Sequence, residues 1–311
     1  MPKNIPKRFT NEDAARAHLE GLRWPDGSVC PHCGCLEKAS RIEGGRAGLL
    51  FCNACRKQYT VTVGTVFERS KIRLNTWLYA NHLLCSSKKG MSAHQMHRTL
   101  GVTYKTAWFM AHRLREAMAP KDNAPPMGGE GKTVEADEMY IGNKAGKRKH
   151  AGSGGYGHKR AILALVERNG QVRSFAIDAP TGYEIRPIMD QNIHFATTKV
   201  YTDSSNVYRF MPTKQHESVN HSEGEYVRYG KDGKKAHTNT VEGVFSIFRR
   251  GMTGTYAHCG EQHLSRYLAE FDFRYSNRAS VGVDDDRRAD IALKAAKGKR
   301  LTYARTDGRS T

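Results

Sequence analysis

The sequence predicts an α/β protein in which a small cysteine-rich module and a helical region precede a larger domain with a mixed sheet. Two C-x-x-C pairs mark the first module, and apolar residues at helical spacing mark the region that follows. From Thr133 onward, short β-type runs alternate with amphipathic helices. The Pro- and Gly-rich stretch Pro120 to Gly131 is typical of a linker. The expected organisation is an N-terminal helix in residues 1–24, the cysteine-rich module in 25–68, the helical region in 69–119, the linker in 120–131, the sheet domain in 132–282 and a basic tail in 283–311.

The two cysteine pairs predict a zinc ribbon. Each C-x-x-C turn presents two thiolates from one tight loop, and a spacer that forms a small hairpin brings both turns to one tetrahedral ion. The expected ligands are Cys30, Cys33, Cys52 and Cys55. His32 and Cys35 stand beside the first turn and are the alternative ligands. The β-type run Tyr59 to Phe67 is expected to complete the small sheet of the ribbon.

The helical region has the layout of a helix-turn-helix. The expected elements are a helix at Asn75 to Cys85, a short helix at Ser92 to Leu100, a turn at Gly101-Val102 and a longer helix at Thr103 to Met118, capped by Thr103. In such a unit the second helix contacts DNA, and here it offers Lys105 and Arg113. A plain helical packing unit has the same pattern and is the alternative.

The charge of the chain predicts a polyanionic partner. There are 50 Lys and Arg against 31 Asp and Glu, so the net charge is +19 at pH 7, and the expected partner is double-stranded DNA. No apolar run approaches the roughly 18 residues of a membrane span, and the polar N-terminus does not resemble a signal peptide. Seven cysteines, an odd number, predict free thiols in a reducing cytoplasm. The basic run Ala292 to Arg309 is expected to be a solvated helix or a nonspecific DNA contact.

An acidic cluster interrupts the β-type run Thr133 to Ile141. Alternation along a strand places Glu135 and Asp137 on one face with Met139, and Glu138 on the other face. Burying such carboxylates without partners would cost several kcal/mol or force them to be protonated. A solvated edge strand is the alternative interpretation.

Two later elements each carry a carboxylate that can join this cluster. Asp203 ends the β-type run Lys199 to Asp203, and Glu242 lies near the start of a predicted amphipathic helix, His237 to Arg250. Two strands and a helix can bring Asp137, Asp203 and Glu242 together, and a divalent cation such as Mg²⁺ would relieve their mutual repulsion. Neither a Ser/His/Asp arrangement nor a phosphate-binding P-loop occurs, so acyl transfer and nucleotide hydrolysis are unsupported.

The segments VEADEMYIG, VYTDSSNVY, HTNTVEGVFSIFRRGMTGTY and HLSRYLAEFDFRYSNR resemble the DDE transposases of the ISXO-like insertion-sequence group. The resemblance covers the cysteine module and roughly residues 130 to 280. It implies a ribonuclease H-like catalytic domain with Asp137, Asp203 and Glu242 as the catalytic, magnesium-binding carboxylates. Asn239, one helical turn before Glu242, is an alternative third ligand. Arg249 stands where the group often has Lys, so its contact with phosphate would differ.

The activity implied by this resemblance is transposition. The protein would bind the terminal sequences of an insertion sequence, cleave DNA strands with one or two Mg²⁺ ions (or Mn²⁺ in their place) and join the ends to target DNA. Pairing two ends implies a homo-oligomer on DNA, in a bacterial cytoplasm and associated with the nucleoid. Two alternatives remain at this level: a metal-dependent nuclease without strand transfer, and a DNA-binding regulator with a degenerate carboxylate site.

Overall fold

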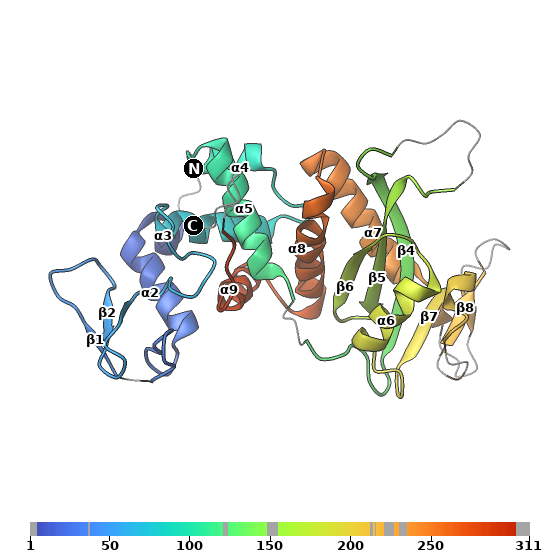
Figure 1. Cartoon of the computed structure of the whole chain (residues 1–311), viewed down its shortest axis with the longest axis horizontal. Coiled ribbons are helices and arrows are strands. Elements are labelled where there is room, and N and C mark those ends of the chain that lie inside the picture. The colour runs from blue at the N-terminus through green and yellow to red at the C-terminus, as the bar shows by residue number, and fades with distance from the viewer. Residues whose placement is uncertain are drawn as a thin grey trace. The chain divides into compact units, whose positions relative to one another are not determined.

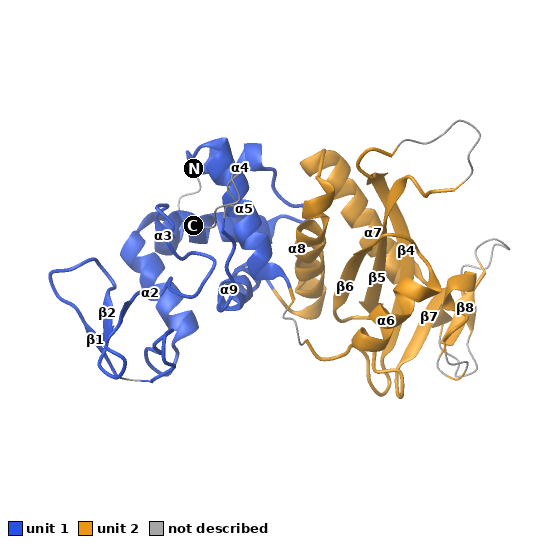
Figure 2. Cartoon of the chain, viewed as in Figure 1, with its two compact units in different colours: residues 1–119, 284–311 blue, residues 120–283 orange. Residues whose placement is uncertain are grey.

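The computed structural model describes residues 5–36, 38–120, 124–147, 155–211, 214, 216–220, 227–229 and 235–302 (Figure 1). The chain forms two compact units (Figure 2). Residues 1–119 and 284–311 make up unit 1, and residues 120–283 make up unit 2. The chain therefore leaves unit 1 after the predicted helical region and returns to it near the C-terminus.

Unit 1 combines a small antiparallel sheet with a group of helices. Its strands, in the sheet order β1-β2-β3, are β1 (Ala39–Arg41), β2 (Leu50–Cys52) and β3 (Gln58–Tyr59). Its helices are α1 (Lys7–Thr10), α2 (Glu12–Arg23), α3 (Leu74–Ser86), α4 (Ala93–Leu100), α5 (Tyr104–Met118) and α9 (Asp285–Ala295). The strand predicted at 59–67 is wrong beyond Tyr59, because the chain turns there and buries Val61, Val66 and Phe67 individually.

Short polar side chains begin α4 and α5. The Ser92 hydroxyl accepts a hydrogen bond from the Gln95 N–H at 3.1 Å, and the Thr103 hydroxyl accepts one from the Thr106 N–H at 3.2 Å. Each bond satisfies an N–H group that has no partner within its own helix. Gly101 ends α4 in the left-handed region, with φ +66°, which glycine adopts without steric cost. The two helices and their tight turn are therefore as predicted.

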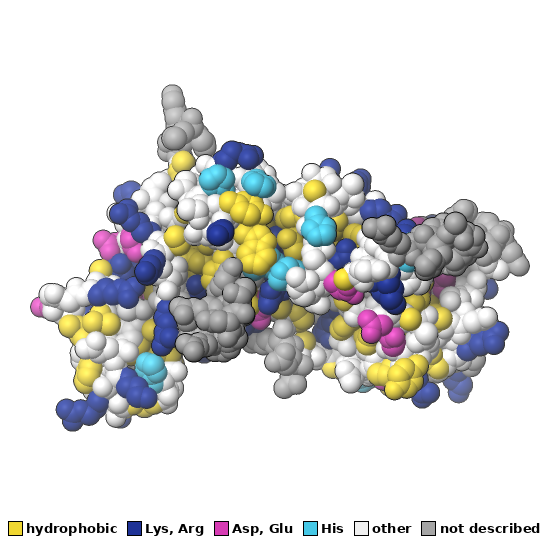
Figure 3. Space-filling model, turned by 45° about the horizontal axis from the view of Figure 1, so that its top comes forward, with side chains coloured by type: hydrophobic (Ala, Val, Ile, Leu, Met, Phe, Trp, Pro, Cys, Tyr) yellow, Lys and Arg dark blue, Asp and Glu magenta, His cyan; other side chains and the backbone are white. Residues whose placement is uncertain are grey.

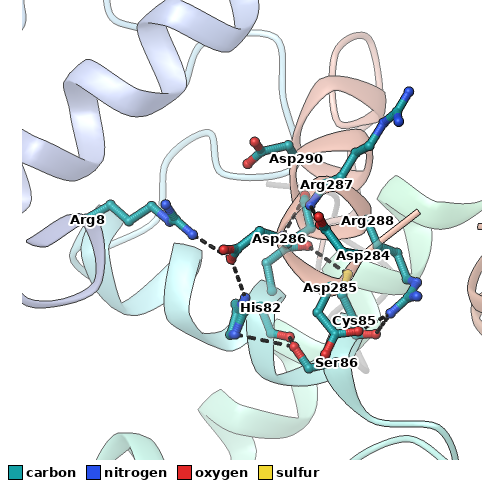
Figure 4. Close-up of polar contacts among 12 residues, drawn as sticks. Arg8, His82, Cys85, Ser86, Asp284, Asp285, Asp286, Arg287, Arg288 and Asp290 are labelled. Atoms are coloured by element: carbon teal, nitrogen blue, oxygen red, sulfur yellow. Dashed lines mark hydrogen bonds and ion pairs between the residues drawn. The ribbon is translucent and has the colours of Figure 1, made fainter. Parts of the chain in front are cut away.

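The helix α9 packs on α3 within unit 1 (Figure 4). The Arg288 guanidinium donates to the Cys85 carbonyl at 3.0 Å, and the Asp286 carboxylate contacts Arg8 at 2.6 Å and His82 at 3.3 Å. Arg288 and Ala289 are buried in α9, and so are Ala292 and Leu293, whose burial corrects the prediction of a solvated helix from Ala292 onward. The remainder of the predicted tail, residues 303–311, lies outside the described residues.

Unit 2 is built on a mixed five-stranded sheet in the order β6-β5-β4-β7-β8. The strands are β4 (Thr133–Asn143), β5 (Lys159–Glu167), β6 (Val172–Ile177), β7 (Lys199–Asp203) and β8 (His216–Val219), with a separate pair β9 (Arg228–Tyr229) and β10 (Lys235–Ala236). The helices are α6 (Gly182–Asn192), α7 (Asn239–Gly251) and α8 (Leu264–Ser276), with short helical turns at Asn206–Tyr208, Met252–Tyr256, Glu261–His263 and Ala279–Val281. The predicted α/β class with a mixed sheet is confirmed.

The acidic strand β4 is the central strand of this sheet. It pairs antiparallel with β5, which pairs antiparallel with β6, and it pairs parallel with β7, which pairs parallel with β8. The alternative of a solvated edge strand is therefore wrong. Met139 lies in the apolar cluster under α7 and α8, whereas Val134 and Ala136 lie in the cluster under α6 (Figure 1). The predicted alternation of the β4 side chains is confirmed by these two clusters.

Basic side chains are prominent on the surface of the protein. On the face drawn in Figure 3, Lys and Arg side chains are spread widely, and Asp and Glu side chains are fewer. This distribution agrees with the net charge of +19. In the part of the chain that the structure describes, no helix combines the length and the apolar character that crossing a bilayer requires.

Glu135 is fully buried, and it holds the start of α7 against β4. Its carboxylate accepts hydrogen bonds from the Thr240 N–H at 2.8 Å and the Val241 N–H at 3.0 Å. The Thr240 hydroxyl and the Arg168 guanidinium each donate to it at 2.7 Å. The carboxylate thus satisfies N–H groups in the first turn of α7 and interacts favourably with the positive end of the helix dipole.

Replacing Glu135 should destabilise unit 2 strongly. Glu135→Ala leaves the Arg168 charge and two helix N–H groups without this partner, so the expected loss of unfolding free energy is about 3 kcal/mol or more. Urea unfolding of the full chain measures this loss. Glu130→Gln, at an exposed position, is the matched control and should change stability by less than about 0.5 kcal/mol. Equal stability of the two variants would show that this cap does not hold α7 to the sheet.

Candidate metal centre and carboxylate site

The four predicted cysteine ligands converge in unit 1. The Sγ atoms of Cys30 and Cys55 are 3.7 Å apart, as are those of Cys33 and Cys52, and all four lie within 4.8 Å of one another. A tetrahedral site with Zn–S bonds of about 2.3 Å requires sulfur separations of about 3.8 Å. A disulfide would need about 2.05 Å. The sulfurs are therefore spaced for a shared metal ion.

Both cysteine turns have the same backbone form. The N–H after each second cysteine donates to the carbonyl of the first: Gly34 to Cys30 at 2.9 Å and Arg56 to Cys52 at 2.8 Å. Gly34 and Arg56 both adopt positive φ, of 75° and 58°. Cys35 is not in the sulfur group, and its carbonyl accepts from the Cys30 N–H at 3.0 Å. It therefore supports the first turn through its backbone.

The thiols of the second turn differ in acidity. The backbone N–H of Cys55 lowers the pKa of the Cys52 thiol to about 7, and burial raises the pKa of the Cys55 thiol to about 12. Thiolates are the metal-binding form, so a cation has to drive ionisation of the less acidic thiol. Zinc fits this donor set and geometry.

Removing two of these sulfurs should remove the zinc. Elemental analysis of the purified full chain should find about one zinc ion per chain, and the double variant Cys52→Ser/Cys55→Ser should lose it and lose the fold of the ribbon. Cys35→Ser is the matched control, because it changes a neighbouring thiol outside the group. Full metal content in the double variant would rule out this ligand set.

In unit 2, Asp137 and Asp203 lie on adjacent parallel strands, each two residues beyond the last observed pair of β4 with β7. The observed pairs are Thr133 with Lys199, Val134 with Val200 and Glu135 with Tyr201. Continued by two residues, this register places Asp137 of β4 beside Asp203 of β7. Residues opposite each other in such a pair point to the same face of the sheet. The Asp203 carboxylate also accepts a hydrogen bond from the Ser205 N–H at 3.0 Å, which holds it at the end of β7.

The third carboxylate comes from α7 and faces a hollow beside β4. Asp137 and Glu242 both line this hollow, whose volume is about 630 Å³, and Arg249 lines it from two turns further along α7. The Thr238 hydroxyl contacts the Glu242 carboxylate at 3.4 Å. The Glu135 cap fixes the start of α7, so it also fixes the position of Glu242 relative to the sheet.

The site strongly disfavours uncompensated negative charge. Burial, together with the charges of Glu138, Asp203 and Glu242, raises the pKa of Asp137 to about 8. Burial, together with the charge of Asp203, also raises the pKa of Glu138 to about 7. In the described ranges, the four cysteines are the only group of three or more His, Cys, Asp or Glu side chains placed to hold a metal ion. Asp137, Asp203 and Glu242 therefore lie near one another without forming a closed ligand group of that kind.

The other predicted site residues fall in different surroundings. Asn239 is the exposed first residue of α7 and does not line the hollow. Lys105 is exposed on α5. Arg113 is buried, with its guanidinium donating to the Glu68 carbonyl at 2.7 Å and lying over the Trp77 ring at 5.5 Å. The prediction of Arg113 as a surface contact is therefore corrected, because this side chain holds unit 1 together.

Several residues that line the hollow are not among the predicted site residues. Glu138 accepts a close hydrogen bond from the Tyr208 hydroxyl, a contact between β4 and the helical turn after β7. Tyr140, Tyr156 and Lys159 also line the hollow. Alternation along β4 puts Tyr140 on the face of Glu138, which is a usable signal. Nothing local brings Tyr156 to the site, because it arrives through the pairing of β5 with β4.

Fold and site together define a two-unit protein with a cysteine metal centre in one unit and a carboxylate-lined hollow on a mixed sheet in the other. Residues 128–276 match the ISXO2-like transposase domain, and residues 10–58 match the transposase zinc-ribbon domain. An uncharacterized protein in transposable element ISH50 of Halobacterium salinarum is 28% identical over 285 residues, which cover 86% of this chain and 92% of that relative. The chain therefore carries an ISXO2-like transposase domain and a transposase zinc-ribbon domain, as its motifs predict.

Proposed function

We propose that this protein is a DDE transposase that binds the ends of an insertion sequence, cleaves DNA strands at those ends and transfers them to target DNA. The observation that carries the proposal is that Asp137 of the central strand lines a hollow with Glu242 of α7 and is near enough to Asp203, at the end of β7, for both charges to act on it. The sheet order supports a ribonuclease H-like fold, in which three antiparallel strands continue into two parallel ones. The match to a transposase domain supports the same activity.

Magnesium fits the donor set of this site. Carboxylate oxygens are the ligands that Mg²⁺ prefers, and a cation would reverse the electrostatic cost that raises the pKa of Asp137. Asp137 and Asp203 would hold it from the sheet, and Glu242 from α7. When bound, one or two such ions activate the attacking water or 3′ hydroxyl and stabilise the leaving oxygen of a phosphodiester displacement.

The chain's own residues position the DNA strand at this site. The backbone at Asp137 is fixed by the pairing of β4 with β5, that at Asp203 by the pairing of β7 with β8, and the start of α7 by Glu135. Arg249 and Arg250, both exposed on the wall formed by α7, present positive charge to a phosphate in the hollow. Arg250 donates to the Ser246 carbonyl at 3.2 Å, which directs its side chain along the helix.

We further propose that α4 and α5 form a helix-turn-helix that reads the ends of the element. The exposed surface of this pair is polar and basic, with Arg98 on α4 and Lys105 near the start of α5. His94 and Tyr104 stack between the two helices, with ring centroids 4.4 Å apart. Phosphate contacts from such a surface orient a duplex. Two ends must be paired for transposition, so the active form on DNA is a homo-oligomer.

Substituting the three carboxylates should separate cleavage from binding. Asp137→Asn, Asp203→Asn and Glu242→Gln keep the side-chain shape and remove a metal ligand, so each should abolish Mg²⁺-dependent cleavage of labelled end DNA while binding persists. Asn239→Ala is the matched control on the first turn of α7 and should keep cleavage. Near-parental cleavage by any of the three variants would exclude that residue. If the parent protein releases only hydrolysed ends and never joins them to target DNA, the activity is that of a nuclease.

Lys105 and Arg113 should behave oppositely in DNA binding. Lys105→Ala removes an exposed charge, so it should weaken binding to end DNA and reduce the slope of log affinity against log salt by about 1. Arg113→Ala removes a buried contact, so it should lower the melting temperature of unit 1 and leave the salt slope of the remaining folded protein unchanged. A salt titration by fluorescence anisotropy measures both. An unchanged slope for Lys105→Ala would move the DNA-reading surface away from α5.

A further inference from the structure

Two aromatic residues line the hollow in addition to its carboxylates. Tyr140 of β4 and Tyr156, just before β5, stack with ring centroids 4.5 Å apart and an interplanar angle of 27°. Both residues line the hollow together with Asp137 and Glu242. Two stacked rings therefore stand in the same hollow as the groups proposed to cut the strand.

The two rings differ in what holds them. Tyr140 is half-buried and packs against the apolar cluster under α6, so β4 and this cluster fix its position. Tyr156 is 55% exposed, which is unusual for so large an apolar surface. Its carbonyl accepts a hydrogen bond from the Lys159 N–H at 2.7 Å, which ties it to the start of β5. The Tyr140 ring, which is held in place, therefore supports the exposed Tyr156 ring.

Positive charge accompanies this aromatic wall. The Lys159 ammonium lies 5.3 Å from the centre of the Tyr156 ring, within the range of a cation–π interaction. Arg249 and Arg250 line the hollow from α7. Proteins bind unpaired nucleotides with aromatic rings, which stack on the flat face of a base, and with cations, which attract the phosphate.

We propose that Tyr140, Tyr156 and Lys159 form a platform for an unpaired nucleobase of the DNA strand that is cut at Asp137, Asp203 and Glu242. This inference rests on the proposed transposase function and adds the form of its substrate. A base inside a duplex is stacked between its neighbours and cannot lie on a protein ring. The platform therefore selects DNA whose bases next to the cut phosphate are open, and it holds that phosphate in the hollow.

The test uses the full-length, zinc-loaded chain without added Mg²⁺. The probe is end DNA with three unpaired nucleotides next to the cleavage position, one of them replaced by the fluorescent base 2-aminopurine. Stacking on a tyrosine ring quenches this base, so the parent protein should quench it on binding. Tyr156→Ala should lose the quenching and bind this DNA about 5- to 140-fold more weakly, the range for losing one base–aromatic stack. Tyr156→Phe keeps the ring and should match the parent.

Two controls separate a platform from simple packing. Tyr156→Leu keeps an apolar cover over Tyr140 but cannot stack a base, so it should resemble Tyr156→Ala in quenching and the parent in melting temperature. Tyr183→Ala removes a tyrosine that is 89% exposed on α6 and does not line the hollow, so quenching should stay parental. Quenching retained in both Tyr156→Ala and Tyr156→Leu would overturn the platform, as would equal affinity of the parent for the open and the fully paired substrate.

The outcome for the platform is distinguishable from that for the proposed function. If the parent cleaves in a manner that depends on Asp137 but shows no quenching that depends on Tyr156, the transposase stands and the platform fails. If Tyr156-dependent quenching occurs but Asp137→Asn cleaves like the parent, the carboxylate assignment fails while the base-binding site stands. Since the quenching assay contains no Mg²⁺, its result does not depend on catalysis.

Discussion

The arrangement of unit 2 depends on one buried carboxylate. Glu135 lies on the central strand and accepts hydrogen bonds from the first turn of α7, a helix that begins more than a hundred residues later in the chain. A buried charge of this kind is tolerable only when its partners are complete, and here two N–H groups, a hydroxyl and a guanidinium supply them. Because the cap sets where α7 starts, it also sets where Glu242 stands relative to Asp137.

The carboxylates that line the hollow differ from Glu135 in their electrostatic surroundings. Glu135 is fully satisfied by donors of the protein, whereas Asp137 is half-buried among other carboxylates and its pKa rises to about 8. The protein thus places a compensated acid and an under-compensated acid two residues apart on the same strand face. Glu135 stabilises the fold, whereas a nearby positive charge would stabilise the ionised form of Asp137. Perturbed carboxylates in a hollow are typical of functional sites, and Arg249 and Arg250 of α7 line the same hollow.

Unit 1 reaches its stability by a different route. Its sheet has three short strands, too small for a substantial core, and the four clustered sulfurs supply a metal-dependent constraint in its place. The helix α9 then adds buried apolar surface from the far end of the chain and closes on α3 through Arg288. Binding of DNA by α4 and α5, as proposed, therefore rests on a unit that two separate parts of the chain complete.

The sequence by itself determined the features that depend on near neighbours. The cysteine spacing, the Thr103 cap and the alternation along β4 reflect interactions over a few residues, and the structure confirms them. Only the tertiary structure decided which side chains are buried by distant partners. Helical spacing cannot say which face of α5 is covered, so Arg113 was predicted on the surface and lies inside. Likewise, no local pattern shows that Glu135 caps a helix, that α9 returns to unit 1, or that Tyr156 stacks on Tyr140, because each of these depends on contacts that exist only after the chain has folded.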